Sequence, residues 1–306
     1  MSLNVVFMGT PEFSVPSLEI LIKNKFNILS VYTQPPKKSK RGQKTNPSPV
    51  EKFCNSNKIN FRNPTSLNNN EELKKFNELF PDIVIVVAYG QIIPNFFFNK
   101  VKFGFINLHA SLLPKWRGAA PIQRAIMNGD KKIGLSIMRI EEKLDTGAVL
   151  LKRELILDQN ETHGEIEKKL SIIGANLLIE SLETIKNGDA KFINQINSEA
   201  TYAKKIDKNE TKIKWDLEAD KVLGHIHGLS PSPGAWFEYE NERFKVLKAK
   251  KSKISGKYGS ILNENLTVAC SSNSIQILEL QRQGKKKQTA IEFLLGKKIK
   301  KGKFLI

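Results

Sequence analysis

Residues 3–32 have the sequence LNVVFMGTPEFSVPSLEILIKNKFNILSVY, and this stretch decides the fold. It contains an apolar run at residues 3–8, an amphipathic segment at 14–22 and a second apolar run at 28–32. Apolar runs separated by a segment with helical periodicity are typical of two parallel strands joined by a helix. The start of the chain therefore predicts a βαβ unit.

Further signals extend this pattern along the first half of the chain. Thr10 and Pro11 stand before the first helix, and we expect Thr10 to cap it and Pro11 to occupy its first position. The run at 83–88 is apolar without alternation, which predicts a central parallel strand buried on both faces. The sequence THGE at 162–165 is a capping box and predicts a long helix that ends at Asn187-Gly188.

The pattern changes in the second half. Helical periodicity weakens after Gly188, so we predict a first domain at 1–188, a linker at 189–205 and a second domain at 206–306. The second domain begins with a helical pattern at 217–229. Short strand patterns follow, which predict a small β-barrel, at residues 236–239, 244–247, 259–262, 266–270 and 275–280.

The composition is that of an ordinary globular protein. Hydrophobic residues make up 40% and charged residues 26% of the chain, which excludes a wholly disordered or fibrous protein. We expect a cytoplasmic protein without a membrane span, because no apolar run approaches the required length of roughly 20 residues and the chain lacks the basic start of a signal peptide. Cys54 and Cys270 form no CxxC pair, so we interpret both as packing thiols.

Positive charge is concentrated near the end of the chain. The 306 residues carry a net charge of +18, and residues 243–306 alone hold 16 Lys or Arg against 3 Asp or Glu. Lysine-rich solvated surfaces would explain a single basic run, but this excess favours a polyanionic partner such as RNA. His225 and His227 lie on the predicted helix without a third ligand nearby, so we expect a solvated pair rather than a metal site.

Polar side chains follow the apolar strand at 103–106. Asn107 and His109 are two positions apart, so they share one face at the carboxyl end of this strand, where parallel sheets bind ligands. Histidine carries protons near neutral pH, and an asparagine amide donates a hydrogen bond to an oxyanion without titrating. The pair alone would fit a loop anchor equally well, and Asp145 before Thr146-Gly147 would by itself be a turn residue.

The segments around these residues are more specific. They are SLLPKWRGAAPIQ at 111–123, LDTG at 144–147, MGTPEF at 8–13 and VAYG at 87–90. Together they resemble the methionyl-tRNA formyltransferase family, and the resemblance covers nearly the whole chain. It implies an α/β protein with a Rossmann-like formyltransferase domain of mostly parallel sheet, followed by a small OB-like β-barrel domain that helps to hold tRNA.

The resemblance also implies the roles of single residues. The catalytic residues of the family correspond to Asn107, His109 and Asp145, with Asn107 and protonated His109 stabilising an oxyanion and Asp145 orienting the imidazole. The cofactor-binding positions are Ser111, Leu112, Leu113, Pro114, Tyr89 and Gly90. The implied reaction moves a formyl group from 10-formyltetrahydrofolate to the amino group of initiator methionyl-tRNA. It needs no metal, and we expect the chain to act as a monomer.

A basic segment with many helix breakers follows the βαβ unit. It has five Lys or Arg among the eight residues from Lys37, which predicts a mobile loop. In the resembling family the matching insertion enters the acceptor arm of the tRNA, and this implies tRNA contacts for Arg41, Lys40 and Lys44. The chain departs from the family pattern at Pro36 and at Ser39-Lys40, and a merely solvated loop remains the alternative.

Two other functions stay open at this point. A folate-dependent formyltransferase acting on a small amine, such as glycinamide ribonucleotide or an amino-sugar nucleotide, would share the same three catalytic residues. It would leave the basic loop and the basic C-terminal region unexplained. A non-catalytic RNA-binding protein is the other alternative, and the complete set of catalytic residues argues against it.

Overall fold

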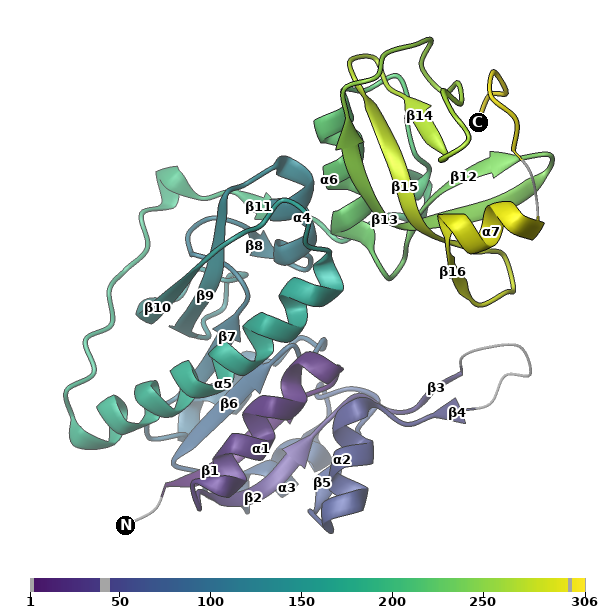
Figure 1. Ribbon diagram of the computed structural model, residues 1–306. Coiled ribbons are helices and arrows are strands. Elements are labelled where there is room, and N and C mark those ends of the chain that lie inside the picture. The colour runs from purple at the N-terminus through teal and green to yellow at the C-terminus, as the bar shows by residue number, and fades with distance from the viewer. Residues whose placement is uncertain (1–2, 39–44, 297–298, 306) are drawn as a thin grey trace. The chain divides into compact units, whose positions relative to one another are not determined.

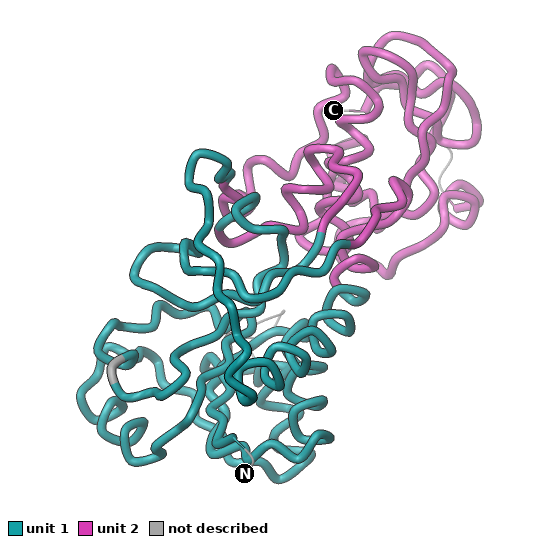
Figure 2. Tube along the Cα trace, turned by 90° about the vertical axis from the view of Figure 1, so that its left-hand side faces the viewer, with its two compact units in different colours: residues 1–117, 134–154, 168–201 teal, residues 118–133, 155–167, 202–306 magenta. Residues whose placement is uncertain are grey.

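The computed structural model describes residues 3–38, 45–296 and 299–305. The chain is divided into two compact units (Figure 2). The first consists of Met1–Arg117, Gly134–Glu154 and Lys168–Thr201, and the second of Gly118–Ile133, Leu155–Glu167 and Tyr202–Ile306. No helix in the described part of the chain is long and apolar enough to cross a membrane.

A seven-stranded sheet organises the α/β part of the chain (Figure 1). In sheet order its strands are β10 (Val149–Ile156), β9 (Lys132–Arg139), β7 (Phe105–His109), β6 (Ile83–Val87), β1 (Asn4–Gly9), β2 (Asn27–Tyr32) and β5 (Phe61–Arg62). Pairings from β7 through β5 are parallel, whereas β9 runs antiparallel to β7. The predicted βαβ unit and the mostly parallel sheet are confirmed. The strand β6 is central and all five of its residues are buried, as predicted.

Helices accompany this sheet: α1 (Val15–Lys23), α2 (Pro49–Asn57), α3 (Asn70–Asn77), α5 (His163–Asn187), and the 3-10 helices η1 (Glu12–Ser14), η2 (Asn95–Lys100) and η3 (Asn197–Glu199). The predicted capping box starts α5, because Thr162 N donates to Glu165 Oε2 at 2.8 Å and Glu165 N donates to Thr162 Oγ1 at 3.4 Å. The helix ends at Asn187, and Gly188 follows with a left-handed φ of +82°.

The predicted capping role of Thr10 is wrong. A 3-10 turn occupies residues 12–14, so α1 begins only at Val15, with Ser14 at the N-cap position. The Thr10 hydroxyl instead donates to the main-chain oxygen of Tyr89 at 2.7 Å and accepts from Gln34 N at 3.2 Å. It therefore links the ends of neighbouring strands rather than the start of a helix.

The second unit contains an antiparallel sheet, which agrees with the predicted fold class. Its strands are β12 (Ala235–Tyr239), β13 (Glu242–Ser252), β15 (Ser274–Arg282) and β14 (Thr267–Ala269) in that order, with β16 (Lys287–Thr289) paired to β15. Residues 259–262, predicted as a strand, contribute only two isolated bridges, at Ser260 and Ile261. The core is apolar and includes the stacked rings of Phe237 and Phe244, 5.5 Å apart.

The remaining elements are α4 (Pro121–Asn128), α6 (Ala219–Leu229), α7 (Ala290–Gly296), the 3-10 helix η4 (Lys208–Thr211) and two pairs of short strands, β8 (Arg117–Gly118) with β11 (Tyr202–Ala203) and β3 (Lys37–Lys38) with β4 (Thr45–Asn46). Helices α4 and α6 pack closely in the second unit. A Cβ at Gly228 would lie 2.9 Å from the main-chain oxygen of Gln123, so only glycine allows this approach.

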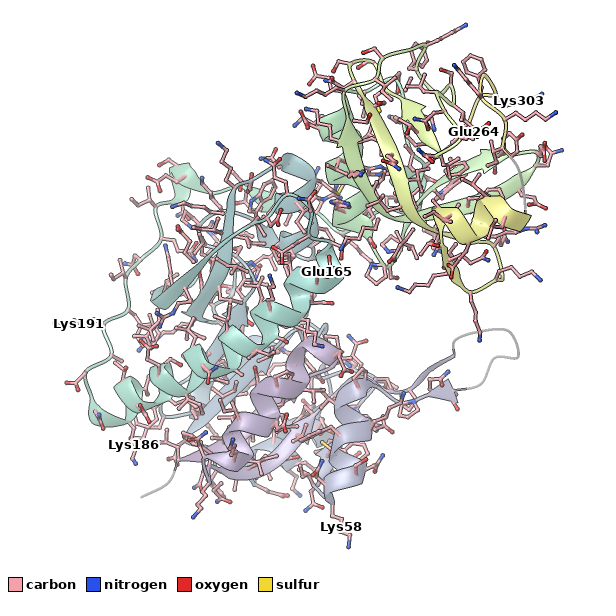
Figure 3. All side chains as sticks on the ribbon, viewed as in Figure 1. Lys58, Glu165, Lys186, Lys191, Glu264 and Lys303 are labelled. Atoms are coloured by element: carbon pink, nitrogen blue, oxygen red, sulfur yellow. The ribbon has the colours of Figure 1, made fainter. Side chains whose placement is uncertain are left out.

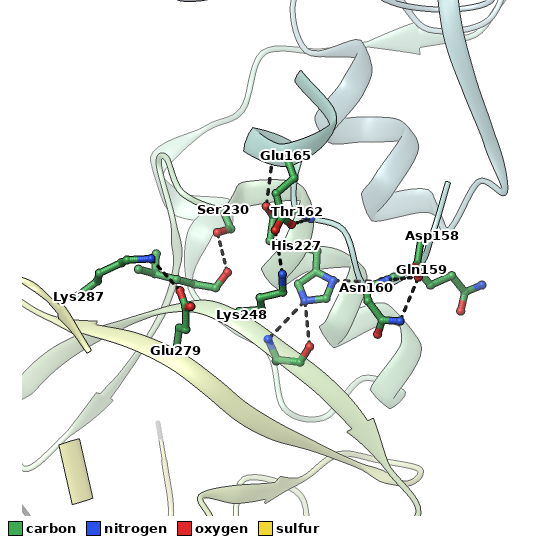
Figure 4. A network of polar contacts seen from close by, with 12 residues as sticks. Asp158, Gln159, Asn160, Thr162, Glu165, His227, Ser230, Lys248, Glu279 and Lys287 are labelled. Atoms are coloured by element: carbon green, nitrogen blue, oxygen red, sulfur yellow. Dashed lines mark hydrogen bonds and ion pairs between the residues drawn. The ribbon is translucent and has the colours of Figure 1, made fainter. Parts of the chain in front are cut away.

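The prediction of a solvated histidine pair on α6 is wrong for His227. This side chain is 1% exposed, and its ring nitrogens lie 3.2 Å from the main-chain oxygen of Gln159 and 3.0 Å from that of Ala249 (Figure 4). In the same network Lys248 Nζ donates to Glu165 at 2.8 Å. Burial lowers the pKa of His227, so the ring is neutral and its single N–H donates to only one of these two oxygens.

A second buried histidine makes stability depend on pH. His163 is the first residue of α5 and is 7% exposed, and burial lowers its pKa from 6.5 to about 4, although the Glu167 carboxylate lies 3.9 Å away. His163 therefore binds a proton below about pH 6.5 in the unfolded chain, but only below about pH 4 in the folded chain. Stability is fully present above pH 6.5 and falls as the pH decreases toward 4.

We predict that His163→Gln reduces this pH dependence. Between pH 7.5 and pH 5.0 the wild-type free energy of unfolding should fall by roughly 1–2 kcal/mol more than that of the variant. Urea unfolding of both proteins at the two pH values provides the measurement. Burial raises the pKa of Glu167 beside His163, but this carboxylate is present in both proteins. Glu165 stays ionised, because hydrogen bonds from Lys248 and Thr162 outweigh its burial and lower its pKa to about 2. Equal pH dependence in the two proteins would contradict the assignment.

Candidate active site

The strand β7 presents Asn107 and His109 on one face. Its register is fixed on both sides, because Asn107 lies opposite Val86 of β6 and opposite Met138 of β9. Leu108 points the other way, and a Cβ at Gly174 of α5 would lie only 2.7 Å from its side chain. Asn107 and His109 therefore face away from α5, as the alternation of the strand requires.

His109 lies between two oxygen atoms. Its side chain is 8% exposed, its Nε2 lies 3.0 Å from the main-chain oxygen of Trp116, and its Nδ1 lies 3.8 Å from Asp145 Oδ2. A carbonyl oxygen only accepts hydrogen bonds, so Nε2 carries the proton in that contact. The distance to Asp145 is too long for a direct hydrogen bond but close enough for an ion pair when the ring is protonated.

Asn107 is half-buried at the end of β7. Among the described residues, no group forms a hydrogen bond with its side chain. The amide lies two residues from His109 on the same strand face, so one substrate atom could contact both.

Asp145 occupies a tight turn before β10. Its φ is +52°, in the left-handed region that aspartate tolerates better than most residues. Gln195 Nε2 donates to the main-chain oxygens of Asp145 at 2.9 Å and of Gly147 at 2.8 Å. A Cβ at Gly147 would lie 2.0 Å from the main-chain oxygen of Arg139, so the turn packs directly on the end of β9.

The segment 111–114 turns its polar side chain inward. Ser111 is fully buried and its hydroxyl donates to the main-chain oxygen of Lys115 at 2.6 Å. Ser136 on β9 holds the segment, since its hydroxyl donates to Ser111 O at 2.7 Å and accepts from Leu113 N at 3.0 Å. Leu113 is fully buried, while Leu112 and Pro114 are half-buried, so a ligand would meet these two side chains first.

Tyr89 and Gly90 follow β6 at the carboxyl edge of the sheet. The Tyr89 ring is 1% exposed within an apolar core cluster, so it faces the interior rather than a ligand. Its main-chain oxygen accepts hydrogen bonds from Thr10 Oγ1 and from Gln34 Nε2. Gly90 is exposed and has a φ of +79°, so this position offers its backbone to a ligand.

The predicted tRNA-binding residues Lys40, Arg41 and Lys44 lie outside the described residues. Their described flanks are the short strands β3 and β4, which pair Lys37 with Asn46 in an antiparallel hairpin. No cluster of three or more His, Cys, Asp or Glu that could hold a metal ion occurs within residues 3–38, 45–296 and 299–305.

Comparisons with known proteins cover both units. The family model described as "Formyl transferase" matches residues 3–182, and that described as "Formyl transferase, C-terminal domain" matches residues 205–298. A methionyl-tRNA formyltransferase of Pelagibacter ubique is 49% identical, with coverage of 99% of this chain and 98% of that protein. The chain belongs to the methionyl-tRNA formyltransferase family.

Solved structures of low sequence identity share the fold. The methionyl-tRNA formyltransferase from Clostridium thermocellum is 22% identical with a TM-score of 0.59, covering 81% of this chain and 93% of that one. HypX from Aquifex aeolicus in complex with tetrahydrofolic acid is 15% identical with a TM-score of 0.65, covering 99% of this chain and 51% of that one. At such identities the likeness concerns the fold alone.

Sequence reasoning missed some of the residues around this site. Trp116 contributes a main-chain oxygen, which any residue could supply and which leaves no sequence signal. Gln195 lies in the segment predicted as a linker. Ser136 had a usable signal, because a serine among the apolar residues Leu135 and Ile137 of a buried strand must find hydrogen-bond partners inside the protein.

We predict that Ser136→Ala destabilises this methionyl-tRNA formyltransferase family member by roughly 1–3 kcal/mol, because it leaves the buried Leu113 N–H without its partner. Ser17→Ala is the matched control. Ser17 is also fully buried, but its hydroxyl has no hydrogen-bond partner among the described residues, so its loss should change stability little. Urea unfolding of the two variants gives the comparison, and equal effects would show that the Ser136 hydrogen bonds do not stabilise the segment.

Proposed function

We propose that this chain transfers the formyl group of 10-formyltetrahydrofolate to the amino group of initiator methionyl-tRNA, with Asn107, His109 and Asp145 as its catalytic residues. One observation carries the proposal. His109 lies 3.8 Å from Asp145 and shares a strand face with Asn107, in a chain similar over its whole length to methionyl-tRNA formyltransferases. Because this reaction serves translation initiation, we propose that the chain acts in the cytoplasm, and we propose further that it acts as a monomer.

The reaction requires stabilisation of an oxyanion. The methionyl amine attacks the formyl carbon, and the carbonyl oxygen becomes negatively charged in the tetrahedral intermediate. The Asn107 amide donates a hydrogen bond to this oxygen, and its lack of a partner among the described residues leaves it available. Collapse of the intermediate breaks the bond to the folate nitrogen and leaves the formyl group on the amine.

Proton transfer balances the reaction. The attacking amine loses one proton and the departing folate nitrogen gains one, so a single carrier serves both events. His109 is the group placed to do this. When Nε2 leaves Trp116 O, the ring proton lies on Nδ1, toward Asp145, and Nε2 is free to accept the amine proton. Asp145 then stabilises the imidazolium that forms, and Nε2 gives the proton to the departing folate nitrogen.

The folate donor binds at the carboxyl edge of the sheet. The exposed backbone of Gly90 offers hydrogen-bonding groups, and Leu112 and Pro114 offer apolar surface. The buried side chains of Tyr89, Ser111 and Leu113 support these positions from within the protein.

The tRNA is bound by basic residues of both predicted domains, residues 1–188 and 206–306. Lys40, Arg41 and Lys44 supply phosphate contacts from the basic loop. In the second unit, lysines such as Lys303 project from the surface (Figure 3). A hollow of about 610 Å³ has four basic residues and one acidic residue, Glu292, in its lining, the basic ones being Arg282, Lys285, Lys286 and Lys287. Formyltransferases that act on small amines need no such surface, so these charges favour tRNA as the acceptor.

We predict that Asn107→Ala and His109→Ala each lower the turnover of methionyl-tRNA formylation by roughly 100- to 1000-fold, because each removes a group that acts in the transition state. The affinity for methionyl-tRNA should change little. The assay supplies 10-formyltetrahydrofolate and methionyl-tRNA to the full chain, with Ser17→Ala as a control away from the site. Near-normal turnover of either variant would remove that residue from the mechanism, and no formyl transfer by the wild type would refute the function.

We predict that Arg41→Ala raises KM for methionyl-tRNA by about tenfold while the affinity for the folate donor stays unchanged, because one desolvated phosphate contact contributes roughly 1–2 kcal/mol. Lys186→Ala removes the same charge from the end of α5 and should leave KM within about twofold. Steady-state kinetics with each substrate varied separately distinguish the two effects. A loss of folate affinity in the Arg41 variant would contradict the proposed tRNA contact.

A further inference from the structure

Gln195 has every hydrogen-bonding group of its side chain occupied. Its Nε2 donates to the main-chain oxygens of Asp145 and Gly147, at 2.9 and 2.8 Å. Its Oε1 accepts from Nε and Nη2 of Arg117, at 3.1 and 2.9 Å. A glutamine amide has two donor hydrogens and two acceptor sites, and all four are used here. Gln195 is therefore not free to contact a substrate.

Arg117 is the second member of this arrangement. Its side chain is 2% exposed, and burying a guanidinium is costly unless its donors are satisfied. The amide oxygens of Gln195 and Asn197 accept from it, Asn197 at 2.9 Å from Nη2. Arg117 directly follows Trp116, whose oxygen contacts Nε2 of His109. A fixed Arg117 side chain therefore fixes the position of the Trp116 carbonyl group.

The segment 195–201, which contains Gln195 and Asn197, also binds the main chain of Trp116 and Arg117 through Thr201. Trp116 N donates to Thr201 Oγ1 at 2.9 Å, and Arg117 N donates to Thr201 O at 2.8 Å. Gln195 thus holds the turn of Asp145, which faces Nδ1 of His109, and Thr201 holds Trp116, whose carbonyl oxygen faces Nε2.

The Asp145 turn needs such support. A non-glycine residue at a φ of +52° costs roughly 1–2 kcal/mol relative to ordinary backbone conformations. A turn held there by few contacts would relax and move its carboxylate. The two hydrogen bonds from Gln195 Nε2 hold the turn at two points, Asp145 and Gly147, on either side of Thr146.

We propose that Gln195 is a positioning residue that sets the placement of Asp145 and Trp116 O relative to His109. This inference rests on the proposed catalytic roles of Asp145 and His109. Gln195 acts only through these groups, so its removal lowers turnover without weakening the binding of either substrate.

The test uses two variants of Gln195 with different defects. Gln195→Glu keeps an oxygen acceptor for Arg117, removes the donors to Asp145 O and Gly147 O, and adds a negative charge that lies against the Arg117 guanidinium. Gln195→Ala removes both halves of the contact. We expect each to lower kcat for methionyl-tRNA formylation by about 10- to 100-fold, with both KM values within about twofold of wild type. Ser17→Ala is the control, because Ser17 lies on α1 away from this network, and its kcat should stay within about threefold.

A double-mutant cycle with Asp145→Asn separates positioning from general destabilisation. If Gln195 acts through Asp145, Gln195→Glu should cause no further loss of kcat in the Asp145→Asn background. Multiplicative losses in the double variant, or normal turnover of Gln195→Glu alone, would overturn the proposal. If Asp145→Asn itself leaves turnover normal, the proposed role of Asp145 fails instead. Gln195→Glu retains a partner for Arg117, so it keeps the test decisive where Gln195→Ala does not fold.

Discussion

The candidate site depends on holding one imidazole ring between two oxygens. Nε2 of His109 contacts the carbonyl of Trp116, and Nδ1 faces the carboxylate of Asp145. The ring itself is fixed by a strand whose register is set on both sides. Both oxygens, in contrast, come from irregular segments, in which backbone order has to be maintained by side chains. Much of the polar structure around the site, from Ser136 to Gln195, serves to order these segments.

The sequence predicted the parts of this arrangement that depend on local patterns. Apolar runs and helical periodicity located the βαβ unit, the central strand at 83–87 and the long helix capped at Thr162. Strand alternation alone placed Asn107 and His109 on one face. Local patterns could not predict that Asp145 lies close to His109, because the two residues are 36 positions apart in the sequence. Only the resemblance to a known family connected them.

The failed predictions have one physical cause. Thr10 was expected to cap a helix and His227 to be solvated, because local rules assign polar side chains to caps or to the surface. In the structure Thr10 donates to a main-chain oxygen 79 residues away, and the His227 ring contacts main-chain oxygens at separations of 68 and 22 residues, one of which accepts its N–H. Buried main-chain oxygens need donors, and the fold takes them from whatever polar side chain is near in space. No single-sequence pattern records that proximity.

The segment at 189–205 shows that a polar composition does not by itself identify a linker between domains. Its polar sequence and weak periodicity predicted a linker, yet the first compact unit continues through Thr201. Gln195, Asn197 and Thr201 satisfy a buried guanidinium and two main-chain groups next to the candidate site. Neutral amide oxygens do this without placing another carboxylate beside Asp145, which would compete with it for positive charge. A segment that forms hydrogen bonds with irregular backbone needs polar side chains. It does not pack an apolar face, so it shows no helical or strand periodicity.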